Sequence, residues 1–332
     1  MAKSLKVLAA QRTRQALARA EFLTEVEELS STTDAPLTIE SERAWWWEDG
    51  RELPMHFVMP DPQVAEGSMI DHIRRFGEYA VDKKPDVIAL LMDWFDYPSL
   101  NSHERWRADY SLRSVVRDYR AGLHARDLLF APLIAEWERS GYWPTIVCVE
   151  GNHDARIWRA LLNDARFDGL IPTPREAFES MGALWYPYLQ PVRVDGVAYC
   201  HFFTKPNSQY PYTGMIETRV KNVGFSFTQG HTPGKMIGGR VLGDGTPVRG
   251  CVVGSFYQGT REARFQGIQG DKNWRGMIVK HAVRNGDYNL MEVDLAFLER
   301  KYGGDTVIAD GDYRRDDFDW GSILARCGEQ GE

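Results

Sequence analysis

The sequence predicts an α/β protein built around a mostly parallel sheet. In its first half, short apolar runs alternate with helical stretches near 66–82 and 103–138. The runs read "MHFVMPD", "DVIALLMD" and "TIVCVEGNHD". Strands separated by helices indicate βαβ units, in which functional loops follow the carboxyl ends of the strands. Beyond about residue 183 the sequence turns β-rich, and "RNGD" at 284–287 predicts a hairpin turn.

Size and composition are those of an ordinary soluble globular protein. The chain has 332 residues, 43% hydrophobic and 26% charged, enough for one large domain or two small ones. A formal charge of -7 argues against a generally basic surface, so contact with nucleic acid would need a local basic patch or metal ions. Four widely spaced cysteines without a CxxC pair indicate reduced, structural thiols. The N-terminus has no secretory pattern and no run of about 18 apolar residues occurs, so we expect a cytoplasmic protein without membrane contact.

Three regions are expected along the chain. Residues 1–50 form an N-terminal arm, with a helix over 4–29 followed by the linker "SSTTDAPLT". Residues 51–305 form the α/β domain, and residues 306–332 form an acidic, loosely held tail. The run from Trp45 to Trp47 is expected to be a docking surface for the arm or for a second subunit, which would make the protein a homo-oligomer.

Metal-ligand residue types stand at the end of five predicted strands. They are Asp61 in "PDPQ", Asp93 and Asp96 in "MDWFD", Asn152 and His153 in "GNHD", His201 in "YCH", and His231 in "GHTP". Carboxylates, imidazoles and an amide oxygen at the edge of one sheet suit a divalent cation. Each of these polar groups would otherwise be desolvated without a partner, so core packing is a poor explanation for the repeated pattern.

These motifs, in the order in which they occur along the chain, resemble those of the calcineurin-like metallophosphoesterases. The resemblance covers about residues 56–235. Outside these motifs, "DYPSLNSHE" and "NWRGMIVKHAVRNGDYNLMEVDLAFLERKY" resemble a phage-encoded branch of that superfamily, which would place the protein in the host cytoplasm. The resemblance implies a two-sheet α/β/α sandwich and a two-metal site. It implies that Asp93 bridges the two metals. It also implies that the second metal is bound by Asn152, His201 and His231. His153 would then act as general acid or as charge stabiliser.

The sequence departs from the family pattern at the first metal. Gln63 stands where the family usually has a histidine ligand, Pro233 replaces a last histidine, and Met92 replaces the glycine before the bridging carboxylate. A neutral amide oxygen at Gln63 favours an oxygen-loving ion, with Mn²⁺ foremost and Mg²⁺, Ni²⁺ and Zn²⁺ as alternatives, in one or two copies. The resemblance leaves two roles open for Asp96, which either binds a metal or orients His153.

Three residues outside the motifs are candidates for substrate binding. Asn101 and His103 stand in the loop after Asp96, and Arg275 in "NWRG" could clamp a phosphate or stack on an aromatic ring. A basic stripe of Arg113, Arg117 and Arg120 is open to a phosphate-binding role, although Asp109 four residues before the first arginine favours a salt-bridged surface.

The expected activity is hydrolysis of a phosphodiester, in nucleic acid or a nucleotide, by metal-activated water. The choice of a diester follows the phage resemblance. Two alternatives stay open: a phosphomonoesterase acting on a small molecule or phosphoprotein, and a binding protein of the same fold that turns over poorly because its first metal site is weakened.

Overall fold

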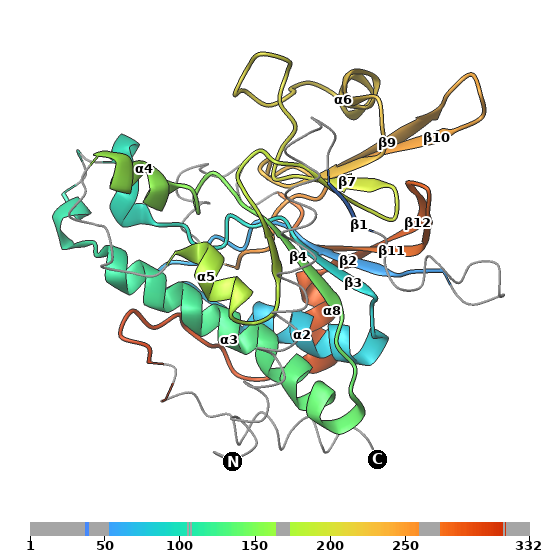
Figure 1. Ribbon diagram of the computed structural model, residues 1–332. Helices are drawn as coiled ribbons and strands as arrows, with labels where there is room; N and C mark the ends of the chain where they lie inside the picture. The colour runs from blue at the N-terminus through green and yellow to red at the C-terminus, as the bar shows by residue number, and fades with distance from the viewer. Residues whose placement is uncertain are drawn as a thin grey trace.

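Two mixed sheets packed against each other form the centre of the molecule, with helices outside them (Figure 1). The computed structural model describes residues 53–104, 106, 108–163, 173–258, 273–314 and 316, and the backbone of 37–39. The sequence prediction of a two-sheet α/β sandwich is confirmed. No helix within these ranges is both long and apolar enough to cross a lipid bilayer.

The first sheet has the strand order β12-β11-β2-β3-β4-β5. Strands β2 to β5 are parallel, and β11 and β12 form an antiparallel hairpin beside β2. The strands of this sheet are β2 (His56–Met59), β3 (Val87–Leu90), β4 (Thr145–Val149), β5 (Leu184–Tyr186), β11 (Gly276–Arg284) and β12 (Asp287–Asp294).

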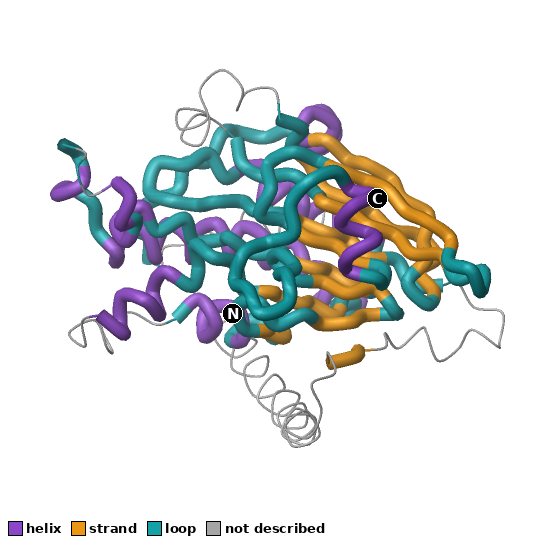
Figure 2. The backbone as a smooth tube through the Cα atoms, turned by 90° about the horizontal axis from the view of Figure 1, so that it is seen from above, coloured by secondary structure: helices purple, strands orange, loops and turns teal. Residues whose placement is uncertain are grey.

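The second sheet has the order β1-β6-β7-β8-β10-β9, in which β7, β8 and β10 run parallel to one another. Its strands are β1 (Leu37–Ile39), β6 (Val192–Val194), β7 (Val197–Tyr199), β8 (Phe227–Gln229), β9 (Met236–Val241) and β10 (Pro247–Val252). Seen from above, the strands gather on one side of the molecule and most long loops on the other (Figure 2).

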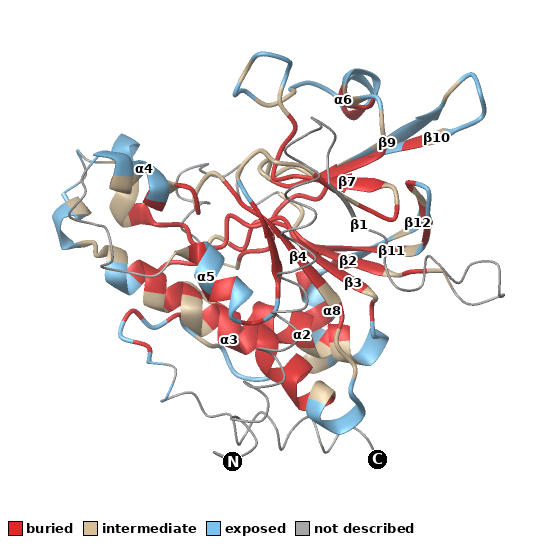
Figure 3. Ribbon diagram, viewed as in Figure 1, coloured by how far each residue is buried: buried red, intermediate tan, exposed pale blue. Residues whose placement is uncertain are grey.

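Most helices cover the outer face of the first sheet (Figure 1). They include α2 (Asp71–Lys83), α3 (Val115–Ser140), α5 (Pro174–Glu179) and α8 (Leu295–Tyr302), whereas α4 (Arg156–Asn163) follows the end of β4 and α6 (Ile216–Val223) packs on the second sheet. Buried residues concentrate in the strands and on the inner sides of α2 and α3 (Figure 3).

Three apolar cores lie between these layers, and the strands alternate between them. In β2, Phe57 and Met59 pack beneath the helices while Val58 faces the second sheet. On the far side of the second sheet, Phe227 packs against Val220 of α6. Because both faces of the strands are buried, their sequences are continuous apolar runs rather than alternating ones.

Two predicted helices begin later than the sequence indicates. The helix expected over 66–82 starts at Asp71, because Met69 forms bridges to Gln258 and Ile308 and the backbone of Ile70 donates to Val307. The helix expected over 103–138 starts at Val115.

Three short 3₁₀ turns, η2 (Pro98–Leu100), η3 (Ser102–Glu104) and η4 (Tyr110–Leu112), precede α3. The hydroxyl of Tyr110 donates to the carbonyl of Ser99, and Asp118 accepts from both the backbone and the hydroxyl of Ser99. These local bonds hold the loop in turns instead of a helix.

Two segments that the sequence places outside the α/β domain contact that domain. Leu37 and Thr38, assigned to the linker, belong to β1, which pairs in parallel with β6. Residues 307–313, assigned to the tail, are packed into the domain, because Ala309 is buried and the Tyr313 hydroxyl donates to Asp127. The predictions for the helix over 4–29, for Trp45 to Trp47 and for Cys327 lie outside the described residues.

The hairpin predicted at "RNGD" is confirmed. Arg284 pairs with Asp287, and the two residues between them, Asn285 and Gly286, have φ of 49° and 82°. Positive φ at both positions is the geometry of a type I′ turn, which Asn-Gly favours. Cys148, Cys200 and Cys251 are buried free thiols, as expected for structural cysteines.

A buried polar network joins the two sheets. The ammonium group of Lys280, in β11, is fully buried and donates to the hydroxyls of Thr228 and Tyr199. Tyr199 also bonds His56, whose other ring nitrogen lies 2.8 Å from Asp195. Burial lowers the pKa of Lys280 from its ordinary value of 10.5 to about 7.

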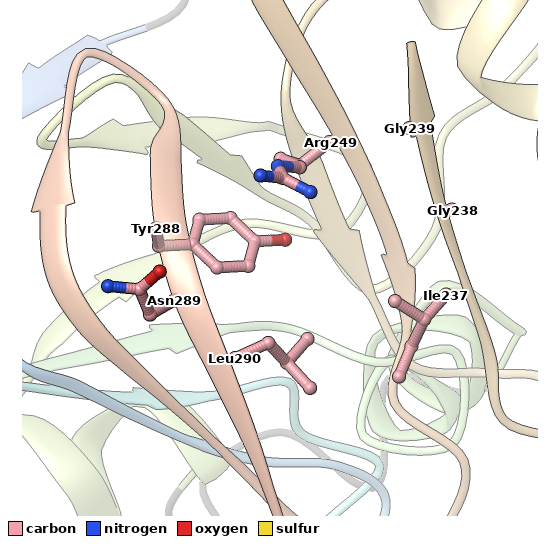
Figure 4. A pocket seen from close by; sticks show the side chains of 7 residues that line it. All are labelled: Ile237, Gly238, Gly239, Arg249, Tyr288, Asn289 and Leu290. Atoms are coloured by element: carbon pink, nitrogen blue, oxygen red, sulfur yellow. The ribbon is translucent and has the colours of Figure 1, made fainter.

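The ring of Tyr288 lies 4.4 Å from the Lys280 ammonium nitrogen and also lines a cavity of about 350 Å³ (Figure 4). Ile237 and Arg249 line the opposite side of this cavity, on β9 and β10. None of its lining residues carries the metal-ligand pattern of the sequence, so the cavity has no part in the candidate metal centre.

Replacing Lys280 should change how stability depends on pH. Between pH 7 and 10.5 the unfolded chain holds the Lys280 proton more tightly than the folded protein does, so unfolding takes up a proton and the free energy of unfolding should rise with pH. We expect Lys280→Met to lose this rise, measured as the difference from wild type in urea melts at pH 7, 8 and 9. The exposed Lys83→Met is the control, and an identical pH slope in Lys280→Met and wild type would contradict the assignment.

Candidate metal centre

The strand ends that carry the predicted ligands meet at one place. Asp61 follows β2 and Asp93 follows β3, while His201 follows β7. Asn152 and His231 occupy the corresponding positions after β4 and β8. These strands belong to both sheets, so the expectation that the ligands share the edge of one sheet is wrong. The carboxylates and the amide come from the first sheet and both imidazoles from the second, so packing of the sheets assembles the site.

Four side chains point at a common centre. One ligand atom from each of Asp93, His201 and His231 lies within 4.8 Å of the others. Nε2 of His201 is 3.3 Å from Oδ2 of Asp93. Oδ1 of Asn152 is 2.9 Å from Nε2 of His201 and 2.8 Å from Nδ1 of His231.

The ring of His201 is fixed by a bond outside the cluster. Its Nδ1 lies 2.7 Å from the carbonyl oxygen of Leu91, and the side chain is fully buried. A backbone carbonyl on Nδ1 selects the tautomer that leaves Nε2 as the ligand atom, the arrangement common around histidine ligands of metals. Nε2 is the nitrogen that faces Asp93 and Asn152.

Glycine precedes two of the ligands because their loops press against the carboxylates. A Cβ at Gly151 would lie 2.1 Å from Oδ1 of Asp93, and a Cβ at Gly230 would lie 2.2 Å from Oδ1 of Asp61. Only glycine allows so close an approach. The close contact lets the backbone of His153 donate to Asp93 at 2.7 Å and that of His231 donate to Asp61 at 3.2 Å.

Several residues of the centre hold a left-handed backbone. Gln63, Met92, Asp93 and His231 have φ between 46° and 63°. This conformation costs about 1–2 kcal/mol for each residue with a Cβ, and such strain concentrates at functional sites. The side chain of Met92 is accommodated in the core beneath the helices despite this backbone conformation.

The charged groups of the centre shift one another's pKa values. Burial, reinforced by Asp93, raises the pKa of Asp61 to about 7. Burial alone would also raise the pKa of Asp93, but His153 and His201 lower it overall. Burial opposes a charge on His201, yet Asp93 outweighs burial and raises the pKa of that ring to about 9. Burial and the neighbouring His201 lower the pKa of His231 to about 4.

These groups fit a divalent cation. One carboxylate, two imidazoles and an amide oxygen form a mixed oxygen and nitrogen donor set suited to Mn²⁺ or Zn²⁺. An ion bound there would replace the proton of His201, because metal ligands must be deprotonated. The amide oxygen Oε1 of Gln63 is buried without a hydrogen-bond donor among the described residues, and the backbone of Gln63 donates to that of Asp93. A second cation beside Asp61 would give this oxygen a partner.

His153 lies beside the cluster and is oriented by Asp96. Its Nδ1 is 2.8 Å from Oδ1 of Asp96, and its Nε2 is 3.8 Å from Oδ2 of Asp93. Burial disfavours a charged ring, but Asp93 and Asp96 together raise the pKa of His153. Of the two roles open for Asp96, the structure has the geometry of the orienting one. Arg156, whose guanidinium donates to the carbonyl of Asp96, steadies this loop.

Asp154, the residue after His153, has a structural role that the sequence pattern did not identify. Its carboxylate is fully buried and accepts from the backbone of Gly151, Trp94 and Phe95. It therefore fastens the loop of Asn152 and His153 to the loop of Asp93. The sequence signal for this role is its position directly after His153 in "GNHD".

The three candidate substrate-binding residues lie outside the ligand cluster. Asn101 accepts from the backbone of His103 and so shapes its own turn, and His103 is exposed. The guanidinium of Arg275 lies 4.9 Å from the ring centre of Tyr257, so Arg275 stacks on an aromatic ring, which was the alternative to clamping a phosphate. The backbone of Arg275 pairs with that of Ser255.

In the basic stripe, Arg113 pairs with Glu104 and, as expected from the spacing, with Asp109. Arg117 pairs with Glu66. The stripe is thus largely a salt-bridged surface rather than an open phosphate site.

Comparison with known proteins gives little further information. Neither the protein-family models nor the curated proteins contain a match to this sequence. Two solved structures resemble the chain weakly, each over 73% of this chain and 99% of its own. One is TT1561 of Thermus thermophilus, with 12% identity and a TM-score of 0.30, and the other has 11% identity and a TM-score of 0.36. Such low scores carry no argument about activity.

A cation bound at the centre should stabilise the fold. Ligand binding to the native state alone adds about 2.7 kcal/mol to the free energy of unfolding at 100 times Kd, so Mn²⁺ should raise Tm and chelator should reverse the rise. His231→Gly removes an imidazole while keeping the left-handed backbone unstrained, and it should abolish the shift. His281→Ala, a half-buried histidine of β11, is the control. Equal Mn²⁺ shifts in His231→Gly and wild type would exclude His231 as a ligand.

Proposed function

We propose that the protein is a metal-dependent phosphoesterase of the calcineurin-like type, acting on a phosphodiester in nucleic acid or a nucleotide. The observation that carries the proposal is His153, held by Asp96 and aimed at the carboxylate side of a cluster of metal-ligand groups. Mn²⁺ is the proposed ion, with Asp93 and Asn152 among the residues that would bind it. The relation to a phage-encoded branch belongs to the proposal and is supported by the sequence motifs alone.

A divalent cation held by these groups would polarise the phosphoryl oxygens and activate the attacking water. His153 has the position of a proton donor, and although burial disfavours its charged form, Asp93 and Asp96 raise its pKa. Asp96 accepts a hydrogen bond from Nδ1 of His153, so Nε2 is the atom that would donate a proton to the leaving oxygen. The backbone contact from His153 to Asp93 keeps the acid at a fixed distance from the cluster.

The type of ester is tested with a pair of chromogenic substrates. With Mn²⁺ we expect hydrolysis of bis(p-nitrophenyl) phosphate at a higher kcat/KM than p-nitrophenyl phosphate. Faster turnover of the monoester, with oligonucleotides left intact, would favour the phosphomonoesterase. Absence of hydrolysis of every ester with Mn²⁺, Mg²⁺, Ni²⁺ and Zn²⁺ would favour a binding protein of the same fold.

Removing the proposed acid should slow turnover without removing the metal. His153→Ala should lower kcat by about 10²–10⁴-fold, as expected for loss of a general acid. Asp96→Asn should lower kcat by about 10–100-fold, since it disturbs only the orientation of His153. Bound metal per chain, measured by atomic absorption, should stay at the wild-type value in both variants.

His281→Ala, which alters a histidine away from the centre, should match wild type in both kcat and metal content. Loss of metal in Asp96→Asn would instead assign Asp96 as a ligand. Loss of metal in His153→Ala would show that His153 is not the acid.

A further inference from the structure

An exposed tryptophan stands next to the loop of the candidate metal centre. Trp158 lies in the first turn of α4, the helix that directly follows "GNHD", and 37% of its surface is accessible. Single exposed aromatic side chains are common and need no explanation. Trp158 differs because its indole N–H donates to Oε1 of Glu150 at 2.7 Å, which fixes the orientation of the ring.

Glu150 is a buried carboxylate that joins two aromatic residues. Only 4% of it is accessible, and its second oxygen accepts from the backbone of Tyr188 at 2.9 Å. Burying a carboxylate is unfavourable unless it is hydrogen-bonded, and Glu150 meets this requirement by accepting from the indole of Trp158 and from the backbone of Tyr188. The hydrogen bond to Glu150 thus orients the indole while 37% of Trp158 stays accessible.

The aromatic residues continue to a candidate metal ligand. The ring of Tyr188 meets that of Phe202 edge to face at 5.8 Å, and Phe202 lies 4.5 Å from the ring of His231. Directly after Trp158 in the chain, exposed Arg159 donates to the backbone carbonyl of Asn152 at 2.6 Å. The exposed side chains of Trp158 and Arg159 therefore lie together on α4, next to the loop that carries Asn152.

This combination suits one class of ligand. A flat aromatic base stacks on an indole face, and a phosphate attached to it is attracted by an arginine and by the cation-binding residues. We propose that Trp158, held by Glu150, is the stacking platform for the nucleobase next to the scissile phosphate. The inference rests on the proposed phosphodiesterase function and narrows its substrate to nucleotidyl esters.

The test compares two esters that share a leaving group. Thymidine 5′-(p-nitrophenyl phosphate) carries a nucleobase and methyl p-nitrophenyl phosphate does not, so the ratio of their kcat/KM values reports on recognition of the base. We expect wild type to prefer the thymidine ester. Trp158→Ala should lower the ratio by about 5–150-fold, the range that loss of base stacking produces. Trp158→Phe, which keeps a ring, should lower it less.

Phe297→Ala is the matched control, because Phe297 of α8 is 38% accessible and lies on the helix-covered side of the first sheet. It should leave the ratio unchanged. An unchanged ratio in Trp158→Ala, or a wild type without preference for the thymidine ester, would overturn the inference while leaving the phosphoesterase proposal intact.

If wild type hydrolyses neither ester, the proposed function fails, and calorimetric titration with thymidine 5′-phosphate decides the subsite separately. Binding that Trp158→Ala weakens would support the platform. Equal binding by Trp158→Ala and wild type, or binding by neither, would refute it.

Discussion

The burial of two carboxylates at the junction of two sheets is the constraint on which the rest of the site depends. Asp61 and Asp93 are each about 2% exposed, and neither can stay ionised there without nearby positive charge. The second sheet supplies that charge through His201, whose raised pKa follows from the proximity of Asp93. The first sheet alone would therefore hold an unfavourable pair of acids, and the two sheets together form a site for a cation.

The local backbone serves the same arrangement. Gly151 and Gly230 allow two loops to approach the carboxylates, and Asp154 ties one of those loops to the next strand end. The left-handed backbone of Asp93 and His231 turns their side chains inward at a cost in conformational energy. A protein that needed only a stable core would have no reason to combine buried acids with strained ligands. Binding of the proposed metal ion would account for both.

The sequence predicted the parts of the site that chain order encodes. Apolar runs ending in Asp61, Asp93 or Asn152 indicate parallel strands, and parallel strands bring their ends to one edge. Which sheet His201 and His231 belong to depends on strand pairing over long distances, and no local pattern shows it. The sequence predicts helix where the turns before α3 lie. Bonds between side chain and backbone stabilise these turns, such as that from the Tyr110 hydroxyl to the Ser99 carbonyl, and the pattern of apolar residues does not reveal such bonds. The sequence does not indicate the pair of Glu150 and Trp158, because the contact between their side chains exists only in the fold.

The proposed site requires side chains from both sheets to bind one metal ion. The most direct measurement is anomalous diffraction from a crystal soaked in Mn²⁺. We expect a peak at about 2.0–2.5 Å from Asp93, Asn152, His201 and His231 together. If Mn²⁺ occupies other sites in the crystal fully but gives no peak among these four residues, a metal site there is excluded. A Mn²⁺ ion bound only by residues of one sheet would also contradict the proposed site.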